Sequence, residues 1–180
     1  MTTALDKLLP FLGDTEKGLV NRFIDFGVDE QLAALYYVYK KMGSSITSAA
    51  PTAADPELAP QLLGDFYELS DDEQLNVMRD IAKNADSRFS RAYGALTENN
   101  QLMVWYAWAK SMGDTVVGMP SDYSPSSAMN QFISDLEAVE FESQISILRA
   151  AAANMGYSEA DAVISQQDTT KTDNVTALNK

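Results

Sequence analysis

The side chains with the clearest chemical signature are aromatic rings that crowd two segments of the chain. They are Tyr36, Tyr37 and Tyr39 in one segment, and Trp105, Tyr106 and Trp108 in the other. On a helix, Tyr36 and Tyr39 lie one turn apart on a shared face, and the same holds for Trp105 and Trp108. Such rings are typical of core packing, yet their polar tips and their recurrence also fit the wall of a groove. A groove of this kind would hold an elongated apolar ligand.

Two arginines, Arg79 and Arg149, stand in the middle of otherwise apolar helical stretches. Each is either a solvated surface residue or a residue at an interface or recognition surface, and the sequence leaves both interpretations open. Acidic clusters such as residues 71–73 are typical of helix starts, and no nucleophile or phosphate-binding loop accompanies them. We therefore expect no catalytic residue and no enzyme.

The residue types that are absent limit the chemistry further. The 180 residues include no His and no Cys, which removes most zinc, haem and histidine-based catalytic designs, so no metal site is expected. A net charge of −13 argues against nucleic acid and against anionic membrane surfaces as partners. No apolar stretch approaches the length of a transmembrane segment, and residues 1–18 lack the pattern of a signal peptide.

Helical periodicity and capping residues predict an all-α fold that positions these side chains. The predicted helices cover residues 6–12, 15–26, 29–42, 58–69, 71–84, 87–96, 99–112, 128–139 and 142–155. Asp29 is expected to cap the helix that Gly43 ends, and Ser70 with Glu73 to form a capping box. We expect one helical domain over residues 1–165 and a flexible polar tail over 166–180.

The sequence also repeats itself at an offset of 70 residues, and residues 28–86 lie over 98–156 with twelve identities. The repeated residues include four glutamines, Gln31, Gln74, Gln101 and Gln144. The repeat predicts an internal duplication that gives two similar four-helix lobes facing each other, with a ligand groove between them.

Four stretches carry a specific resemblance to a known family. They are VDEQLAALYYVYKKMGSSITSAAPTAA from residue 28, NNQLMVWYAWAKSM from 99, MPSDY from 119 and QISILRAAAANMGYS from 144. In this order they resemble the N-terminal, carotenoid-binding domain of the cyanobacterial orange carotenoid protein. The likeness runs from about residue 15 to 160 and stops where that protein's linker would begin, so it implies a stand-alone helical carotenoid protein.

The resemblance implies a keto-carotenoid held non-covalently between two four-helix lobes. Canthaxanthin is the first candidate, and echinenone and 3'-hydroxyechinenone are alternatives. The positions that match the family's carotenoid contacts are Leu32, Leu35, Tyr36, Tyr39, Met78, Leu102, Trp105, Tyr106, Ala109, Met112, Met119, Pro120, Tyr123, Ile145, Ser146 and Arg149. The chain departs from the family at Tyr36, where Trp is usual, and at Ala109, where Gly is usual. Burial of apolar area would supply most of the affinity for an uncharged polyene.

The implied function is photoprotection, in which the bound chromophore quenches singlet oxygen and the protein also carries carotenoid. Its partners would be the carotenoid, a separate homologue of the missing C-terminal domain that exchanges pigment, and the phycobilisome. The location would be cytoplasmic, including the thylakoid surface where phycobilisomes lie. Two alternatives are a constitutive quencher of phycobilisome excitation, since Arg149 matches the family's docking arginine, and a pigment-free helical interaction module.

Deletion of residues 166–180 is expected to leave pigment binding intact, because this polar segment has little apolar surface to bury. The measurement is the visible absorbance per protein of the full-length and shortened chains, both expressed in a carotenoid-producing host. A colourless shortened protein would contradict the prediction.

Overall fold

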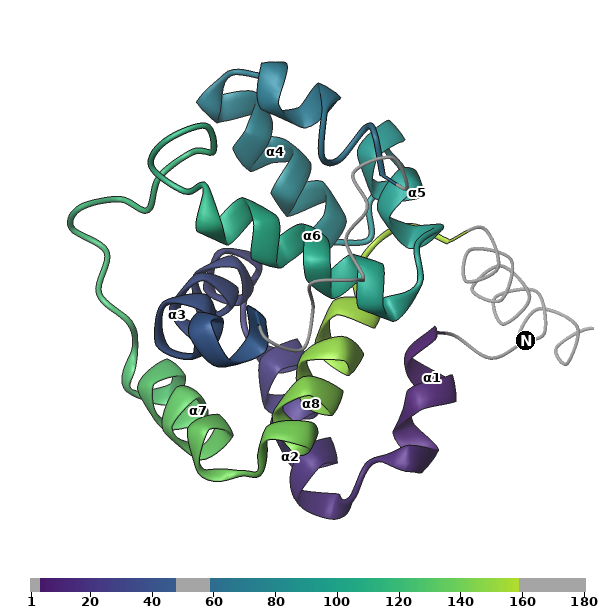
Figure 1. Cartoon of the computed structure of the whole chain (residues 1–180), viewed down its shortest axis with the longest axis vertical. Helices are drawn as coiled ribbons and strands as arrows, with labels where there is room; N and C mark the ends of the chain where they lie inside the picture. The colour runs from purple at the N-terminus through teal and green to yellow at the C-terminus, as the bar shows by residue number, and fades with distance from the viewer. Residues whose placement is uncertain (1–3, 48–58, 159–180) are drawn as a thin grey trace, which may run out of the picture.

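Helices make up most of the described chain, as the sequence predicts. The computed structural model describes residues 4–47 and 59–158. In chain order the elements are α1 (Ala4–Leu8), the 3-10 helix η1 (Leu9–Phe11), α2 (Asp14–Asp25), α3 (Val28–Thr47), the 3-10 helix η3 (Asp65–Glu68), α4 (Asp71–Ala82), α5 (Arg88–Gly94), α6 (Glu98–Lys110), α7 (Ser127–Ala138) and α8 (Phe141–Ala153) (Figure 1). The β-type pairing in these ranges is one isolated bridge between Met112 and Val116. The all-α class is therefore confirmed, whereas the predicted tail, 166–180, lies outside the described residues.

Helix α3 corrects two predicted boundaries. It begins at Val28, so Asp29 lies within its first turn and does not cap it. It also continues through Gly43 to Thr47. A Cβ atom at Gly43 would lie 2.8 Å from Cδ2 of Tyr39. Glycine at this position leaves room for the ring of the preceding turn, and it does not end the helix.

The predicted helix over residues 58–69 is also wrong. Residues 60–64 form turns, and the helical part is the short η3. A Cβ atom at Gly64 would collide with the carbonyl oxygen of Pro60. The tight turn lets the carbonyl of Leu62 accept a hydrogen bond of 3.0 Å from Nε1 of Trp108. Contact with α6 therefore shapes this segment, and no local pattern reveals that contact.

The two sequence repeats interlock, so neither forms a lobe by itself. The offset of 70 residues places α3 and α4 over α6 and α8, and the same offset, carried beyond the aligned ranges, places α2 over α5. In space, however, α2 packs against α7 and α8, whereas α4 packs against α5. One group contains α2, α7 and α8, and the other contains α4 and α5, so each group draws on both halves of the chain. Helix α3 packs against α7 as well as against α4 and α6, and these contacts join the two groups (Figure 1). The origin of this arrangement in an internal duplication remains a prediction.

The four repeated glutamines share one structural role. Each is the fourth residue of its helix, Gln31 in α3, Gln74 in α4, Gln101 in α6 and Gln144 in α8. Each side-chain Nε2 donates to backbone carbonyls near the end of the preceding helix, over distances of 2.9–3.4 Å. Carbonyls at a helix C-terminus have no partner within the helix. These glutamine clamps satisfy them and fix the corner between consecutive elements.

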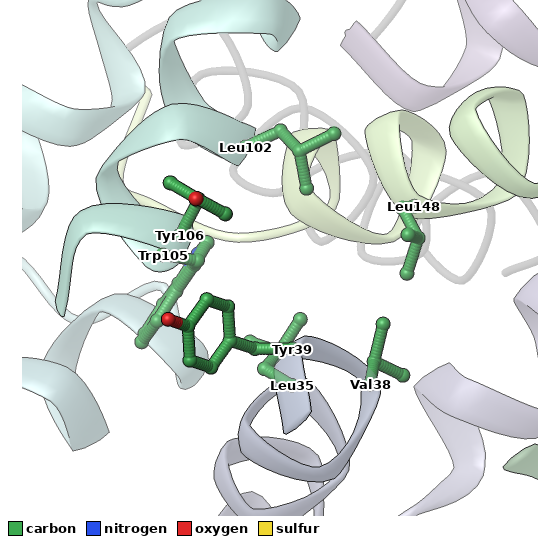
Figure 2. Close-up of a pocket in the computed structure, with 7 residues that line it drawn as sticks. All are labelled: Leu35, Val38, Tyr39, Leu102, Trp105, Tyr106 and Leu148. Atoms are coloured by element: carbon green, nitrogen blue, oxygen red, sulfur yellow. The ribbon is translucent and has the colours of Figure 1, made fainter. Parts of the chain in front are cut away.

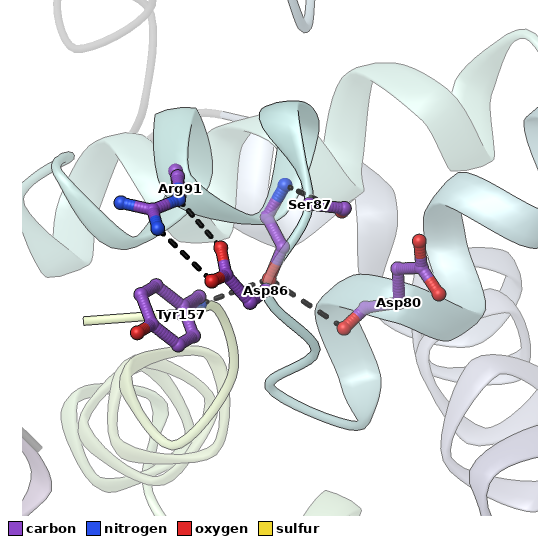
Figure 3. Close-up of polar contacts among 6 residues, drawn as sticks. Asp80, Asp86, Ser87, Arg91 and Tyr157 are labelled. Atoms are coloured by element: carbon purple, nitrogen blue, oxygen red, sulfur yellow. Dashed lines mark hydrogen bonds and ion pairs between the residues drawn. The ribbon is translucent and has the colours of Figure 1, made fainter. Parts of the chain in front are cut away.

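Residues after α8 tie the end of that helix to α4 and α5. The N–H of Gly156 donates to the carbonyl of Ile81 at 2.9 Å. The N–H of Tyr157 donates to the carbonyl and to Oγ of Ser90, at 3.1 and 2.9 Å. The Arg91 guanidinium lies 4.8 Å from the centre of the Tyr157 ring and also binds the carboxylate of Asp86 (Figure 3). Gly156 adopts a φ of +90°, which glycine tolerates without strain.

Replacement of Gln74 by leucine is expected to lower the free energy of unfolding by about 2–4 kcal/mol. Gln74 is 2% exposed. Its amide donates to the carbonyls of Leu69 and Thr115, and its Oε1 accepts from the N–H of Val117 at 2.7 Å. Leucine would leave these three backbone groups without their side-chain partner; a fully buried group would cost about 1–3 kcal/mol, and because these bonds are only partly buried we expect a combined loss of about 2–4 kcal/mol. Urea unfolding of the purified protein measures the change.

The matched control is Gln144→Leu, at the corresponding position of α8. Gln144 is partly exposed and bonds the carbonyls of Glu137 and Val139, so water replaces its bonds and the expected loss is about 1 kcal/mol or less. Equal losses in the two variants would show that burial does not decide the strength of a clamp.

Candidate functional site

Three adjoining cavities run along the contact between α3 and α6. The end cavity has a volume of about 280 Å³ and is lined in part by the loop over residues 117–123. It shares Leu32, Met78 and Met112 with a middle cavity of about 20 Å³. The middle cavity shares Leu35 and Trp105 with a far cavity of about 30 Å³. Each cavity shares wall residues with the next, and we call this row of three separate cavities the track.

Helical spacing positions the two long walls of this track. Helix α3 contributes Leu32, Leu35, Tyr36 and Tyr39, which follow the spacing of a single helix face. Helix α6 contributes Leu102, Trp105, Tyr106 and Ala109 with the same spacing. Figure 2 shows the far cavity, with α3 on one side, α6 on another and Leu148 of α8 on a third.

Most of the predicted site residues line the track. The end cavity holds Leu32, Met78, Met112, Met119, Pro120 and Tyr123, and the other two add Leu35, Tyr36, Tyr39, Leu102, Trp105, Tyr106 and Ala109. The three predicted residues of α8, Ile145, Ser146 and Arg149, do not line these cavities in the described structure. Ile145 packs against the hydrophobic core, and Oγ of Ser146 donates to the carbonyl of Glu142 within the helix.

Several lining residues escaped the sequence analysis, and they fall into two classes. Val38 lies three residues after Leu35, and Leu148 lies 70 residues after Met78, so helix spacing and the repeat would have found them. Val117 and Gly118 belong to a loop without periodicity. Gln74 holds that loop through the N–H of Val117, and this contact is visible only in the folded chain.

A buried hydrogen-bond chain fixes the indole of Trp105 in the wall. Nε1 of Trp105 donates to Oη of Tyr93 at 2.8 Å, and that hydroxyl donates to the carbonyl of Ala152 at 2.9 Å. Tyr93 is fully buried, and this burial raises the pKa of its phenol far above the usual value, so the group remains a donor. The polar edge of Trp105 is thus satisfied within the core.

Two tyrosines meet across the path of the track. The rings of Tyr39 and Tyr106 make an edge-on contact with centroids 5.3 Å apart, and Figure 2 shows them between α3 and α6. Burial raises the pKa of the Tyr39 phenol, with a smaller contribution from Tyr106. Both rings line the far cavity, whose volume is only about 30 Å³.

The end cavity differs from the rest of the track because it carries charged groups. Nε and Nη2 of Arg79 donate to the two carboxylate oxygens of Asp29, at 2.8 and 3.0 Å. These hydrogen bonds lower the pKa of the Asp29 carboxyl. The aromatic ring of Tyr123, on the same wall, stacks on Tyr37 with centroids 6.2 Å apart. Arg79 is therefore an interface residue that joins α4 to α3.

Arg149 has no such partner among the described residues, although it occupies the position of Arg79 in the second repeat. The residue that corresponds to Asp29 is Asn99, whose side chain is neutral. Nε of Arg149 is buried and forms no hydrogen bond with the described residues. The two arginines therefore have different environments.

The site suits binding better than bond-making chemistry. The described residues include no cluster of three or more His, Cys, Asp or Glu side chains able to hold a metal ion. In the same part of the chain, no helix has the length and apolar character needed to cross a membrane. The walls of the three cavities are mainly aromatic and aliphatic, which is typical of sites for apolar ligands.

Several known proteins have related sequences. Residues 11–158 match the family described as orange carotenoid protein, N-terminal. An orange carotenoid-binding domain-containing protein of Nostoc is 40% identical over 145 residues, which cover 80% of this chain and 85% of that protein. The orange carotenoid-binding protein of Synechocystis is 29% identical in an alignment that covers 89% of this chain and 57% of that protein.

Solved structures share the fold as well. The red carotenoid protein of Anabaena (Nostoc), binding canthaxanthin, aligns with a TM-score of 0.71 and 32% identity over 80% of this chain and 99% of its own. The orange carotenoid protein of that organism, also binding canthaxanthin, aligns with a TM-score of 0.74 and 30% identity over 83% of this chain and 48% of its own. Sequence and fold together place this chain in the family of the orange carotenoid protein N-terminal domain, a family of carotenoid-binding proteins and not of enzymes.

Proposed function

We propose that this protein binds a keto-carotenoid non-covalently in the track between α3 and α6, and that the pigment quenches singlet oxygen in photoprotection. The observation that supports the proposal is the row of adjoining cavities, lined by most of the residues that match the family's carotenoid contacts. Canthaxanthin is the first candidate because both solved relatives bind it, and echinenone and 3'-hydroxyechinenone share its chemistry. The protein binds and orients the pigment, which supplies the photophysics when bound.

The proposed pigment must widen the track. Ligand sites usually measure about 300–1,000 Å³, whereas the middle and far cavities measure about 20 and 30 Å³. The rings of Tyr39 and Tyr106 therefore separate to admit the polyene. Burial of its apolar surface, at about 25 cal/mol per Å², offsets the loss of their contact.

A second candidate function is quenching of excitation energy in the phycobilisome. The observation that favours it is Arg149, whose buried Nε forms no hydrogen bond with the described residues. A partner's carboxylate would satisfy this guanidinium. The net charge of −13 opposes unaided docking on an acidic antenna. Pigment exchange with a homologue of the C-terminal domain, in the cytoplasm or at the thylakoid surface, is compatible with either function.

The visible absorption spectrum of the full chain, purified from a host that makes canthaxanthin, tests carotenoid binding. A broad carotenoid band that elutes with the protein supports the proposal, and lower singlet-oxygen phosphorescence with loaded than with empty protein supports the quenching role. Loss of phycobilisome fluorescence on mixing favours the second candidate. A folded, colourless protein contradicts both and favours a pigment-free interaction module.

Trp105→Ala is expected to lower pigment occupancy about tenfold when pigment is limiting. The variant removes an aromatic wall shared by the middle and far cavities, and the loss of about 1.4 kcal/mol of contact energy corresponds to tenfold in affinity. The measurement is the ratio of carotenoid to protein absorbance after purification.

The matched control is Phe132→Ala, in α7. Phe132 is buried but lines none of the three cavities, so this variant loses stability while its pigment ratio stays near that of the original protein. An unchanged ratio in Trp105→Ala, or an equal fall in both variants, would show that Trp105 is not part of the binding wall.

A further inference from the structure

The end cavity contains more polarity than a hydrocarbon ligand requires. Its walls are largely apolar, as at Leu32, Leu75 and Met78, yet Arg79 and Asp29 line it as well. The far cavity, at the opposite end of the track, has no charged residue on its described walls. A polar group in an otherwise apolar site usually sets orientation and specificity.

Arg79 has hydrogen-bond donors to spare. A guanidinium carries five N–H groups, and Asp29 accepts two of them, one from Nε and one from Nη2. Within the described residues Arg79 forms no other hydrogen bond. The two-point contact with Asp29 orients the guanidinium, and Arg79 lines the end cavity, so its remaining donors are available to a ligand there.

Arg79 also lies where the cavity meets solvent. Its side chain is 36% exposed. Arg79 and Asp29 line both the end cavity and a separate surface depression that includes Gly27, Glu30 and Lys83. The inner part of a ligand seated in the end cavity therefore contacts aliphatic side chains, while an atom at its outer edge meets a cation.

The volume of the end cavity matches a ring. An apolar cavity of about 150 Å³ is enough to hold benzene, and the end cavity measures about 280 Å³. A substituted six-membered ring therefore fits, whereas the far cavity, at about 30 Å³, must expand to take one. The end cavity is the pre-formed part of the track.

We infer that Arg79 is a specificity-determining residue, which donates a hydrogen bond to the carbonyl oxygen of a keto end ring seated in the end cavity. The inference rests on the proposed carotenoid function and adds the residue that distinguishes keto-carotenoids from carotenoids without a keto group. A ring without oxygen offers no acceptor to the guanidinium and still displaces water from it, so a pure hydrocarbon binds less tightly. Because the far cavity has no cation on its described walls, one keto ring is sufficient, and it occupies the end cavity.

The test is competitive loading of the empty full-length protein with equal amounts of canthaxanthin, echinenone and β-carotene, followed by extraction and chromatography of the bound pigment. Canthaxanthin has two keto rings, echinenone has one and β-carotene has none. The original protein is expected to take each keto-carotenoid about tenfold more than β-carotene, the size of effect that a charged hydrogen bond gives. The amount of bound canthaxanthin is expected to exceed that of echinenone only about twofold. Either of the two keto rings of canthaxanthin can occupy the end cavity, whereas echinenone has one such ring.

Arg79→Met keeps a long side chain and removes the hydrogen-bond donors. In this variant the ratio of bound keto-carotenoid to bound β-carotene is expected to fall close to one. Lys83→Met is the matched control, since it removes a neighbouring cation that lines the depression but not the end cavity, and its preference is unchanged. If Arg79→Met fails to fold because Asp29 has lost its partner, the double variant Asp29→Asn/Arg79→Met removes both charges and answers the same question.

The outcomes separate the inference from the proposed function. An original protein that takes up no carotenoid overturns the proposed function. An original protein that takes up all three pigments equally overturns the inference alone, as does a folded Arg79→Met protein that keeps its preference. Loss of the preference in Tyr123→Phe but not in Arg79→Met would identify the phenol as the donor and overturn the assignment to Arg79.

Discussion

The hydrogen bonds from four glutamines to the preceding helix are the constraint on which the rest of this structure depends. A chain of short helices must turn many corners, and every corner leaves carbonyl groups without a partner. Here the corners before α3, α4, α6 and α8 are closed in the same way, by an amide in the first turn of the next helix. Because these hydrogen bonds fix the angle between consecutive helices, they also fix how facing helices align with each other. The walls of the track depend on that alignment.

The residues of the two long walls lie at equal sequence distances from two of these glutamines. Leu32 and Leu35 lie one and four residues after Gln31, and Leu102 and Trp105 lie one and four residues after Gln101. The equal spacing explains why α3 and α6 present matching faces to each other. The side chains at these matching positions differ in size, as Leu35 does from Trp105 and Tyr39 from Ala109. Tyr39 lines the far cavity and Ala109 lines the middle cavity, and both cavities are small.

Local patterns predicted the features that depend on neighbouring residues in the sequence. Helix spacing identified the faces of α3 and α6, and the capping box of Ser70 and Glu73 is present. The failures have different causes. Gly43 lies within α3 and makes room for the ring of Tyr39 one turn earlier, so it does not end the helix. Residues 60–64 contact Trp108 of α6, which is a tertiary contact.

The charged wall of the end cavity could not be predicted for a related reason. Asp29 and Arg79 are 50 residues apart in the sequence, and no periodicity joins them. The Tyr39–Tyr106 contact, by contrast, joins two residues that the sequence had already placed on facing walls. It has a consequence for the protein before it meets any ligand. With the rings in contact, Leu35, Val38, Trp105 and Leu148 of the far cavity are buried, so the protein keeps these apolar side chains away from solvent before any ligand arrives.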